Sequence, residues 1–226
     1  YWIYPTYSQK YEDQLHFDAF SSPDLVTWTK HENIITSKEI SWLRQALWAP
    51  SVVKKDSLYY LFFGANDVHE GEIGGIGVAV ADSPTGPFRD ALGKPLYDNG
   101  SWDNIDPTVM IDDDGQAYIY WGNPQIYFAK LNEDMVTLNG EVKKIKMTEE
   151  GFGAPSMKER EKDKKYKDCY TEGPWISKRN GKYWLLYAAG GVPEHIAYSV
   201  SEAPEGPWKY VGEIMPLEDT KSFTNH

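Results

Sequence analysis

Short runs of apolar residues alternate with polar turns along the chain, and few segments show the three- and four-residue apolar spacing of a helix. One type of run is rich in aromatic residues and occurs at residues 1–6, 58–64, 117–122 and 182–188. Short segments of aromatic and β-branched residues between turn residues are typical of strands. The pattern therefore predicts an all-β protein.

These strands belong to a larger repeat. Each aromatic strand precedes a second strand that ends in a turn, and three of them follow a run containing proline, at residues 48–53, 106–111 and 172–176. Tyr59, Tyr118 and Tyr183 mark equivalent positions about sixty residues apart, and self-similarity at such a period indicates a β-propeller. We expect four-stranded antiparallel blades with hairpin turns at residues 56–57, 112–115 and 180–181. The acidic run 112–114 lacks the ligand spacing of a calcium loop, which favours a hairpin turn there.

The charge balance and the aromatic content bear on the partner. The 226 residues include 23 Lys and Arg against 34 Asp and Glu, a net charge of −11, which disfavours nucleic acids and anionic membranes as partners. No apolar run reaches the length of a membrane-spanning helix. Nine Trp and sixteen Tyr favour a sugar ligand, because aromatic rings stack on sugar faces, although β-sheets are rich in these residues in any case. The single cysteine, Cys169, excludes an internal disulfide and shows no metal-binding pattern.

Two carboxylates begin equivalent proline-containing runs and are candidates for chemistry. Glu172 lies among aromatic residues, where apolar surroundings raise a carboxyl pKa towards that of a general acid. Asp106 takes the matching place in the preceding repeat, so we expect the two acids to converge on one pocket of the propeller. A surface Glu and a strand-initiating Asp turn are the structural alternatives. Paired carboxylates in an aromatic cleft suit hydrolysis of a glycosidic bond.

The chain resembles glycoside hydrolase family 43 over nearly its whole length. The resemblance rests on Trp48-Ala49-Pro50, residues 105–108, residues 170–175, the Pro-x-Gly-Pro turns and the final Thr-Asn-His. It implies a five-bladed β-propeller and an inverting single displacement. Glu172 then matches the general acid, and Asp106 matches the residue that tunes the acid's pKa and holds the sugar. His226 matches a histidine at the channel centre, beside a calcium ion or an ordered water.

The repeat also leads to expectations about binding residues and blade limits. We expect Trp48, Ile105 and Trp121 to contact the sugar. The expected blades are residues 1–40 for a partial first blade, then 41–98, 99–150 and 151–215, with 216–226 starting a fifth blade that is largely missing. The general base of the family belongs just before Tyr1. We therefore expect these residues to be a fragment that is unstable or inactive alone.

The implied activity is release of terminal pentosyl residues from arabinoxylan- or arabinan-type glycans, with α-L-arabinofuranosyl favoured over β-xylosyl residues. The expected partner is an oligo- or polysaccharide containing arabinose or xylose, with no required cofactor beyond a structural calcium ion. The loops at 67–75 and 143–167 are expected to close one side of the pocket, which favours exo action on a terminal sugar. Two alternatives stay open: a related five-bladed fructan hydrolase that retains configuration through an Asp nucleophile, and a carbohydrate-binding propeller with a degenerate site.

Overall fold

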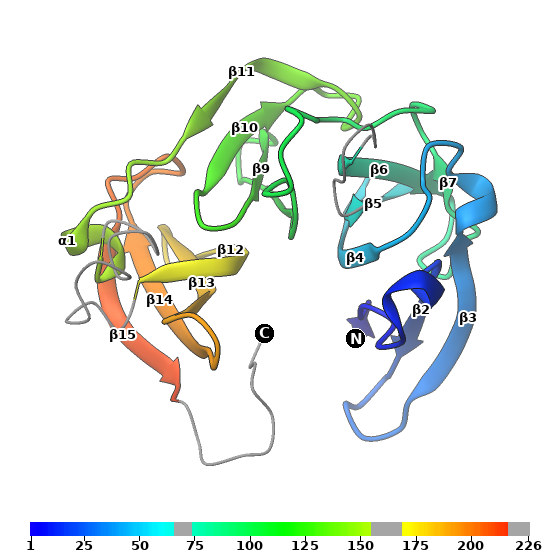
Figure 1. Ribbon diagram of the computed structural model, residues 1–226, viewed down its shortest axis with the longest axis horizontal. Helices are drawn as coiled ribbons and strands as arrows, with labels where there is room; N and C mark the ends of the chain where they lie inside the picture. The colour runs from blue at the N-terminus through cyan, green and yellow to red at the C-terminus, as the bar shows by residue number, and fades with distance from the viewer. Residues whose placement is uncertain (66–73, 155–168, 217–226) are drawn as a thin grey trace. The chain divides into compact units, whose positions relative to one another are not determined.

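The computed structural model describes residues 1–65, 74–154 and 169–216, and strands are its main regular elements (Figure 1). The first sheet has the order β1-β2-β3 and the second the order β4-β5-β6-β7. Their bounds are β1 Trp2–Ile3, β2 His16–Ser21, β3 Thr29–Thr36, β4 Leu47–Lys55, β5 Leu58–Ala65, β6 Gly75–Ala81 and β7 Arg89–Asp90. Two short 3-10 helices, η1 (Tyr11–Asp13) and η2 (Ser37–Glu39), flank β2 and β3.

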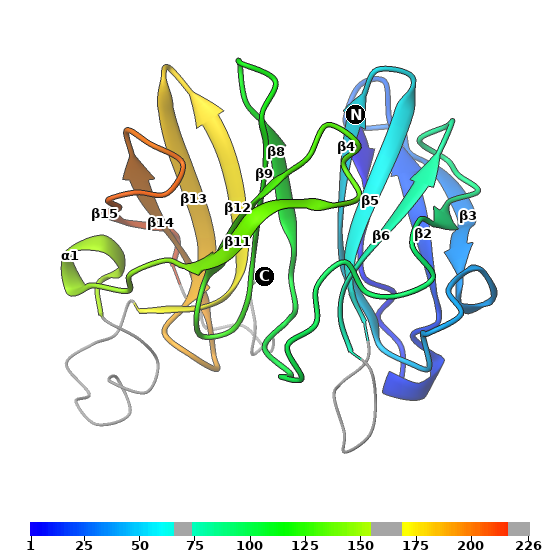
Figure 2. The same cartoon turned by 90° about the horizontal axis from the view of Figure 1, so that it is seen from above.

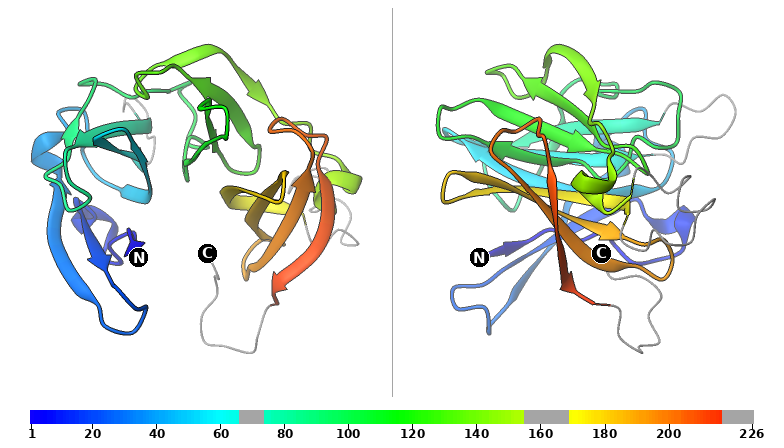
Figure 3. Two further views of the ribbon diagram at one scale, coloured as in Figure 1. Left: turned by 180° about the vertical axis from the view of Figure 1, so that it is seen from behind. Right: turned by 90° about the vertical axis from the view of Figure 1, so that its left-hand side faces the viewer.

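The third sheet has the order β11-β10-β9-β8 and the fourth the order β12-β13-β14-β15. Their bounds are β8 Thr108–Ile111, β9 Ala117–Trp121, β10 Tyr127–Leu131, β11 Leu138–Lys144, β12 Tyr170–Arg179, β13 Lys182–Ala189, β14 His195–Ser201 and β15 Lys209–Met215. The fourth sheet runs from yellow to red in strand order (Figure 3). The proline-containing runs thus form β4, β8 and β12, each the first strand of its sheet along the chain. The predicted all-β architecture is confirmed.

The hairpin turns lie where the sequence predicts them. Asp56 (φ 54°), between β4 and β5, and Asn180 (φ 53°), between β12 and β13, are in the left-handed region, which Asn and Asp tolerate better than other residues with a Cβ. Between β8 and β9 the Gly115 N–H donates to the Asp112 carbonyl at 2.9 Å, which closes a turn. The acidic run 112–114 is therefore a hairpin turn, as expected.

The turns that follow β2, β6, β10 and β14 form two matched pairs. Asp24 accepts hydrogen bonds from the N–H groups two and three residues later, and Asp134 does the same. The residues that follow them, Leu25 and Met135, have φ angles of 64° and 62°. The other pair closes on glycine, with Gly86 N–H donating to the Ser83 carbonyl and Gly206 N–H to the Ala203 carbonyl. The turn after β10 thus repeats the geometry of the turn after β2.

Contacts divide the chain into two compact units, one of residues 1–109 with 131–138 and the other of residues 110–130 with the described residues from 139 onward. The core of the first unit includes Phe17, Ile34, Ile35, Leu47, Leu61, Phe63 and Phe88. The core of the second includes Tyr120, Phe128, Phe152, Tyr170, Leu185, Tyr187 and Trp208. The short helix α1 (Glu149–Phe152) lies beside β15 and supplies Phe152 to this core (Figure 2).

An ion-pair cluster ties the third sheet to the fourth within the second unit. Asp112 accepts hydrogen bonds from the Lys178 ammonium of β12 and from the Tyr183 hydroxyl of β13. Its side chain is only 5% exposed, so the two donors replace the water that the carboxylate loses. Burial alone would raise the pKa of Asp112, but these hydrogen bonds outweigh it and hold the pKa below its usual value.

Among the described residues, no helix has the length and apolar character needed to cross a membrane.

Candidate active site

Glu172 lies near the start of β12 and is half-buried. The side-chain amide of Asn123, which follows β9, donates a hydrogen bond from Nδ2 to Oε2 of Glu172 at 2.5 Å. Both residues belong to the second unit, although 49 positions separate them along the chain. The carboxyl group therefore has a fixed neutral donor on one of its two oxygens.

The two residues before Glu172 are anchored by hydrogen bonds. The Tyr170 hydroxyl donates to the Gly122 carbonyl at 2.5 Å, and the Thr171 hydroxyl accepts from the Gly191 N–H at 2.9 Å. The Tyr170 ring lies in the core, 5.4 Å from the centre of the Tyr187 ring. These buried contacts order the backbone that leads into Glu172, so its carboxyl group starts from a fixed position.

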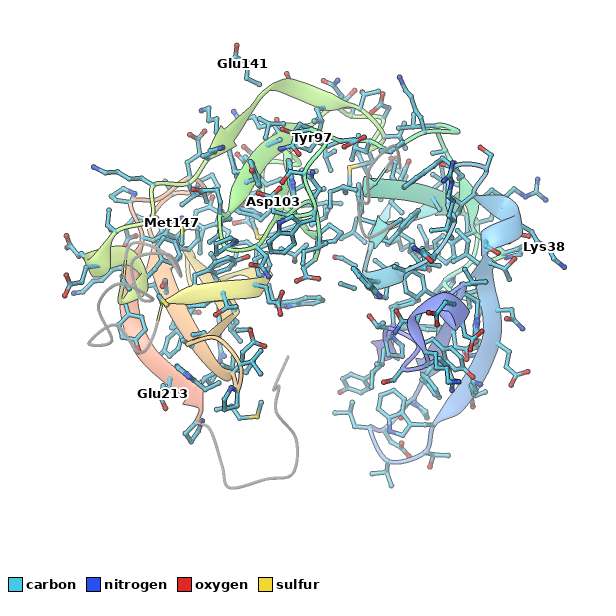
Figure 4. The ribbon with its side chains drawn as sticks, in the orientation of Figure 1. Lys38, Tyr97, Asp103, Glu141, Met147 and Glu213 are labelled. Carbon is cyan, nitrogen blue, oxygen red and sulfur yellow. The ribbon has the colours of Figure 1, made fainter. Side chains whose placement is uncertain are left out.

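Asp106 lies two residues before β8 in the first unit and is half-buried. A φ of 56° puts it in the left-handed region. The stretch before it is held by Ile76, whose N–H donates to the Tyr97 carbonyl at 2.9 Å, and by Asn104, whose amide donates to Asn99 Oδ1 at 2.6 Å. Figure 4 labels Tyr97 and Asp103 in this stretch. Asp106 therefore follows an ordered loop.

A left-handed residue before proline recurs at the start of three sheets. Ala49 (φ 44°), Asp106 (φ 56°) and Gly173 (φ 61°) each precede a proline. The ladder with the next strand shifts register at this point in β4 and in β12, as expected for a bulge. This backbone match pairs Asp106 with Gly173, and Ile105 with Glu172. Asp106 and Glu172 therefore begin equivalent strands with an offset of one residue, which sequence letters do not show because they do not reveal which residue is left-handed.

Asp106 belongs to the first unit and Glu172 to the second, so the surroundings of each residue are described within its own unit. Their convergence on one pocket stays a prediction. Asn123 and Gln14 are site neighbours that the sequence did not single out, since each comes from a polar loop and contacts its partner across a long stretch of chain. No local pattern marks such contacts.

The three residues expected to contact sugar differ in exposure. Trp48 is half-buried and donates from Nε1 to Gln14 Oε1 at 2.5 Å. Ile105 is also half-buried. Trp121 is 0% exposed and stacks on Tyr127, with ring centres 5.6 Å apart. Trp121 thus packs as an interior residue and presents no accessible face to a sugar, because both faces of β9 are buried.

The histidine expected near a calcium ion, His226, lies outside the described residues. Within 1–65, 74–154 and 169–216, no group of three or more His, Cys, Asp or Glu residues could hold a metal ion. Cys169 is buried immediately before β12. At the candidate site the structure describes one carboxyl group held by a neutral hydrogen-bond donor, that of Glu172 with the Asn123 amide.

Residues 1–224 match the family model for glycosyl hydrolases family 43. The chain belongs to this family. The family 43 chain is 36% identical over 228 residues to a β-D-galactofuranosidase of Aspergillus niger, covering 92% of the chain and 59% of that protein. It is 33% identical to a xylosidase/arabinosidase of Humicola insolens, with 92% and 69% covered.

Solved structures agree with this family. A β-xylosidase/α-arabinofuranosidase from a compost metagenome, crystallised with xylotriose in a calcium-free form, has a TM-score of 0.80 at 28% identity, with 100% of the chain and 76% of that structure covered. An α-L-arabinofuranosidase from Clostridium thermocellum has a TM-score of 0.72 at 30% identity, with 95% and 69% covered. The family 43 chain thus contains part of a five-bladed β-propeller, and its four sheets are propeller sheets. It spans 59 to 69% of the length of these two curated relatives.

Proposed function

We propose that the protein is a glycoside hydrolase that releases terminal pentosyl residues from arabinoxylan- or arabinan-type glycans, with α-L-arabinofuranosyl favoured over β-xylosyl residues. The observation that carries this proposal is the half-buried Glu172 carboxyl, held by the Asn123 amide in a family 43 chain. Relatives named as xylosidases, arabinosidases and arabinofuranosidases support the pentoside. A relative crystallised with xylotriose supports an oligosaccharide partner.

In the proposed mechanism Glu172 is the general acid. Its proton passes to the glycosidic oxygen while the bond from that oxygen to the sugar carbon breaks, and water attacks the carbon from the opposite face. Asp106 holds the sugar and tunes the pKa of the acid, with Trp48 and Ile105 beside the ring. In an inverting site the base that activates water stands about 6.5–9.5 Å from the acid. We assign no residue of this chain to that role.

The proposal keeps a structural calcium ion and assigns it to one residue, His226. One relative is described as a calcium-free form, which indicates that calcium is a relevant ion for that protein. Exo action also stays a proposal, because the loops expected to favour it, 67–75 and 143–167, lie largely outside the described residues.

The test is the Glu172→Gln variant of the full-length protein, assayed on nitrophenyl α-L-arabinofuranoside and β-D-xyloside. We expect turnover to fall by about 10²–10⁴-fold, the usual share of acid–base catalysis, while sugar binding measured by calorimetry persists. Product anomers followed by NMR should show inversion. Retention would favour the fructan hydrolase type, and binding without turnover in the wild type would favour a carbohydrate-binding propeller.

A second candidate substrate is a β-D-galactofuranoside, because a relative 36% identical to the chain is named as a β-D-galactofuranosidase. The nitrophenyl β-D-galactofuranoside belongs in the same assay. Turnover of this compound above that of both pentosides would move the proposal from pentosides to hexofuranosides and leave the role of Glu172 unchanged.

A further inference from the structure

Asn123 is the residue whose contact with Glu172 the proposed function does not yet use. It follows Trp121 and Gly122 at the end of β9, and its amide Nδ2 lies 2.5 Å from Glu172 Oε2. A 2.5 Å contact is short for an N–H···O bond, which favours a direct interaction without intervening water. The general acid candidate of the fourth sheet thus has its donor in the turn that follows β9 of the third sheet.

The turn that carries Asn123 has little freedom to move. Gly122 has a φ of 119°, and a Cβ at this position would stand 2.1 Å from the Gln125 carbonyl oxygen. The Gln125 amide donates to the Ile126 carbonyl at 2.9 Å and to the Ile145 carbonyl at 2.8 Å. The Tyr170 hydroxyl ties the same turn to β12 through the Gly122 carbonyl. The Asn123 amide is therefore fixed relative to the strand that bears Glu172.

We infer that Asn123 is a positioning residue for the general acid: its amide donates to Oε2 of Glu172 and so fixes the orientation of the carboxyl group that transfers the proton. The proton passes from the carboxyl group to the leaving oxygen, which keeps the electron pair of the broken sugar–oxygen bond, and Glu172 becomes a carboxylate. This inference rests on the proposed role of Glu172.

A neutral amide suits this position better than a charged donor or acceptor. It donates to the carboxyl group in both protonation states, so the orientation is kept through the proton transfer. Lysine there would favour the carboxylate strongly and lower the pKa of the acid, and aspartate would raise it through like-charge repulsion. Asparagine therefore fixes the geometry and adds no net charge.

The experiment compares Asn123→Ala and Asn123→Asp in the full-length protein on two pentosides, one with a dinitrophenyl and one with an alkyl leaving group. A dinitrophenolate leaves without protonation, whereas an alkoxide needs the acid. We expect Asn123→Ala to lower kcat on the alkyl pentoside by about tenfold or more, a part of the 10²–10⁴-fold supplied by acid catalysis. On the dinitrophenyl pentoside kcat should change little. The apparent pKa of the acid, taken from its limb of the pH–rate profile, should rise in Asn123→Ala and rise further in Asn123→Asp.

The control is Asn132→Ala, which removes an amide that bonds Thr137 Oγ1 and the Leu138 carbonyl within a turn of the third sheet. Its kcat and pH limb should match the wild type. Equal losses on both leaving groups with an unmoved pH limb in Asn123→Ala and Asn123→Asp would overturn the inference and leave Asn123 a structural residue. Unchanged turnover in Glu172→Gln would instead remove the proposed function. Thermal unfolding of each variant shows whether a loss comes from the fold.

Discussion

Gly64 of β5 lies against the backbone of Ile105, so that a Cβ added to Gly64 would stand 3.3 Å from the Ile105 Cα and 3.6 Å from the Asp106 nitrogen. Gly64 pairs with Trp48 across the β4–β5 ladder. The absence of a side chain at Gly64 therefore lets the segment that carries Asp106 approach the second sheet of the first unit.

Enlarging Gly64 should displace this segment in proportion to the added volume. We expect Gly64→Val to lower kcat/KM by about 10–100-fold, since a 1 Å misplacement of a catalytic group can cost 10²-fold. Gly64→Ala should have a smaller effect, because 3.3 Å needs a shift of only a few tenths of an ångström. Kinetics with the preferred nitrophenyl pentoside check both. Equal activity of the two variants and the wild type would show that the approach does not position Asp106.

Removing the carboxylate at position 106 should have separable effects on activity and stability. Asp106→Ala and Asp106→Gly both delete the carboxylate, so we expect similar losses of turnover. At a φ of 56° glycine is unstrained and alanine is not, so Asp106→Ala should be less stable than Asp106→Gly by roughly 1 kcal/mol. Urea unfolding and steady-state kinetics measure the two effects.

The matched control is Ala49→Gly, which relaxes the equivalent left-handed position without touching a carboxylate. It should keep full turnover. If Asp106→Gly also kept full turnover, Asp106 would have only a structural role at the start of β8.

The Asp112–Lys178 pair predicts a pH-dependent contribution to stability. The pKa of Asp112 is lowered in the folded state, because the hydrogen bonds from Lys178 and Tyr183 outweigh burial. The stabilisation is therefore present above the unfolded-state pKa of about 3.9 and disappears as the pH falls through the folded-state pKa. We expect Asp112→Asn to lower the free energy of unfolding at pH 7 by about 1.5–3 kcal/mol, the range for hydrogen bonds to charged groups. The difference from the wild type should shrink in acid.

Asp113 provides the comparison, since its carboxylate lies 2.9 Å from the same Lys178 ammonium but its side chain is 87% exposed. Asp113→Asn should cost less than about 1 kcal/mol, as expected of an exposed ion pair. Denaturant titrations at several pH values distinguish the two positions. A pH-independent loss in Asp112→Asn would assign the effect to packing.

The two tryptophans expected to bind sugar should respond in opposite ways to truncation. Trp121 is fully buried, so Trp121→Ala should cost about 3–5 kcal/mol of stability. Trp48 is half-buried, so Trp48→Ala should cost less stability and should raise KM. Calorimetric melting curves and KM values decide this. A raised KM in Trp121→Ala with an unchanged melting temperature would restore Trp121 to the binding surface.

Much of the fold follows from the sequence because strand and turn chemistry is local. Three of the four aromatic runs form the central strands β5, β9 and β13, the first forms the edge strand β1, and Asn180 and Asp56 are left-handed at the predicted hairpins. The site is less accessible from sequence, since its contacts join distant segments. Asn123 reaches Glu172 across 49 positions, and nothing near Asn123 marks it. Trp121 illustrates a further limit: in a strand buried on both faces, alternation no longer tells an interior ring from an accessible one.

The left-handed residue before proline also bears on how the repeat can diverge. Ala49, Asp106 and Gly173 share a left-handed φ and differ in side chain. Codons for alanine, aspartate and glycine can be interconverted by single changes of the second base. A blade copied from its neighbour can therefore gain or lose a carboxylate at this position in one mutational step, while the path of its main chain stays the same.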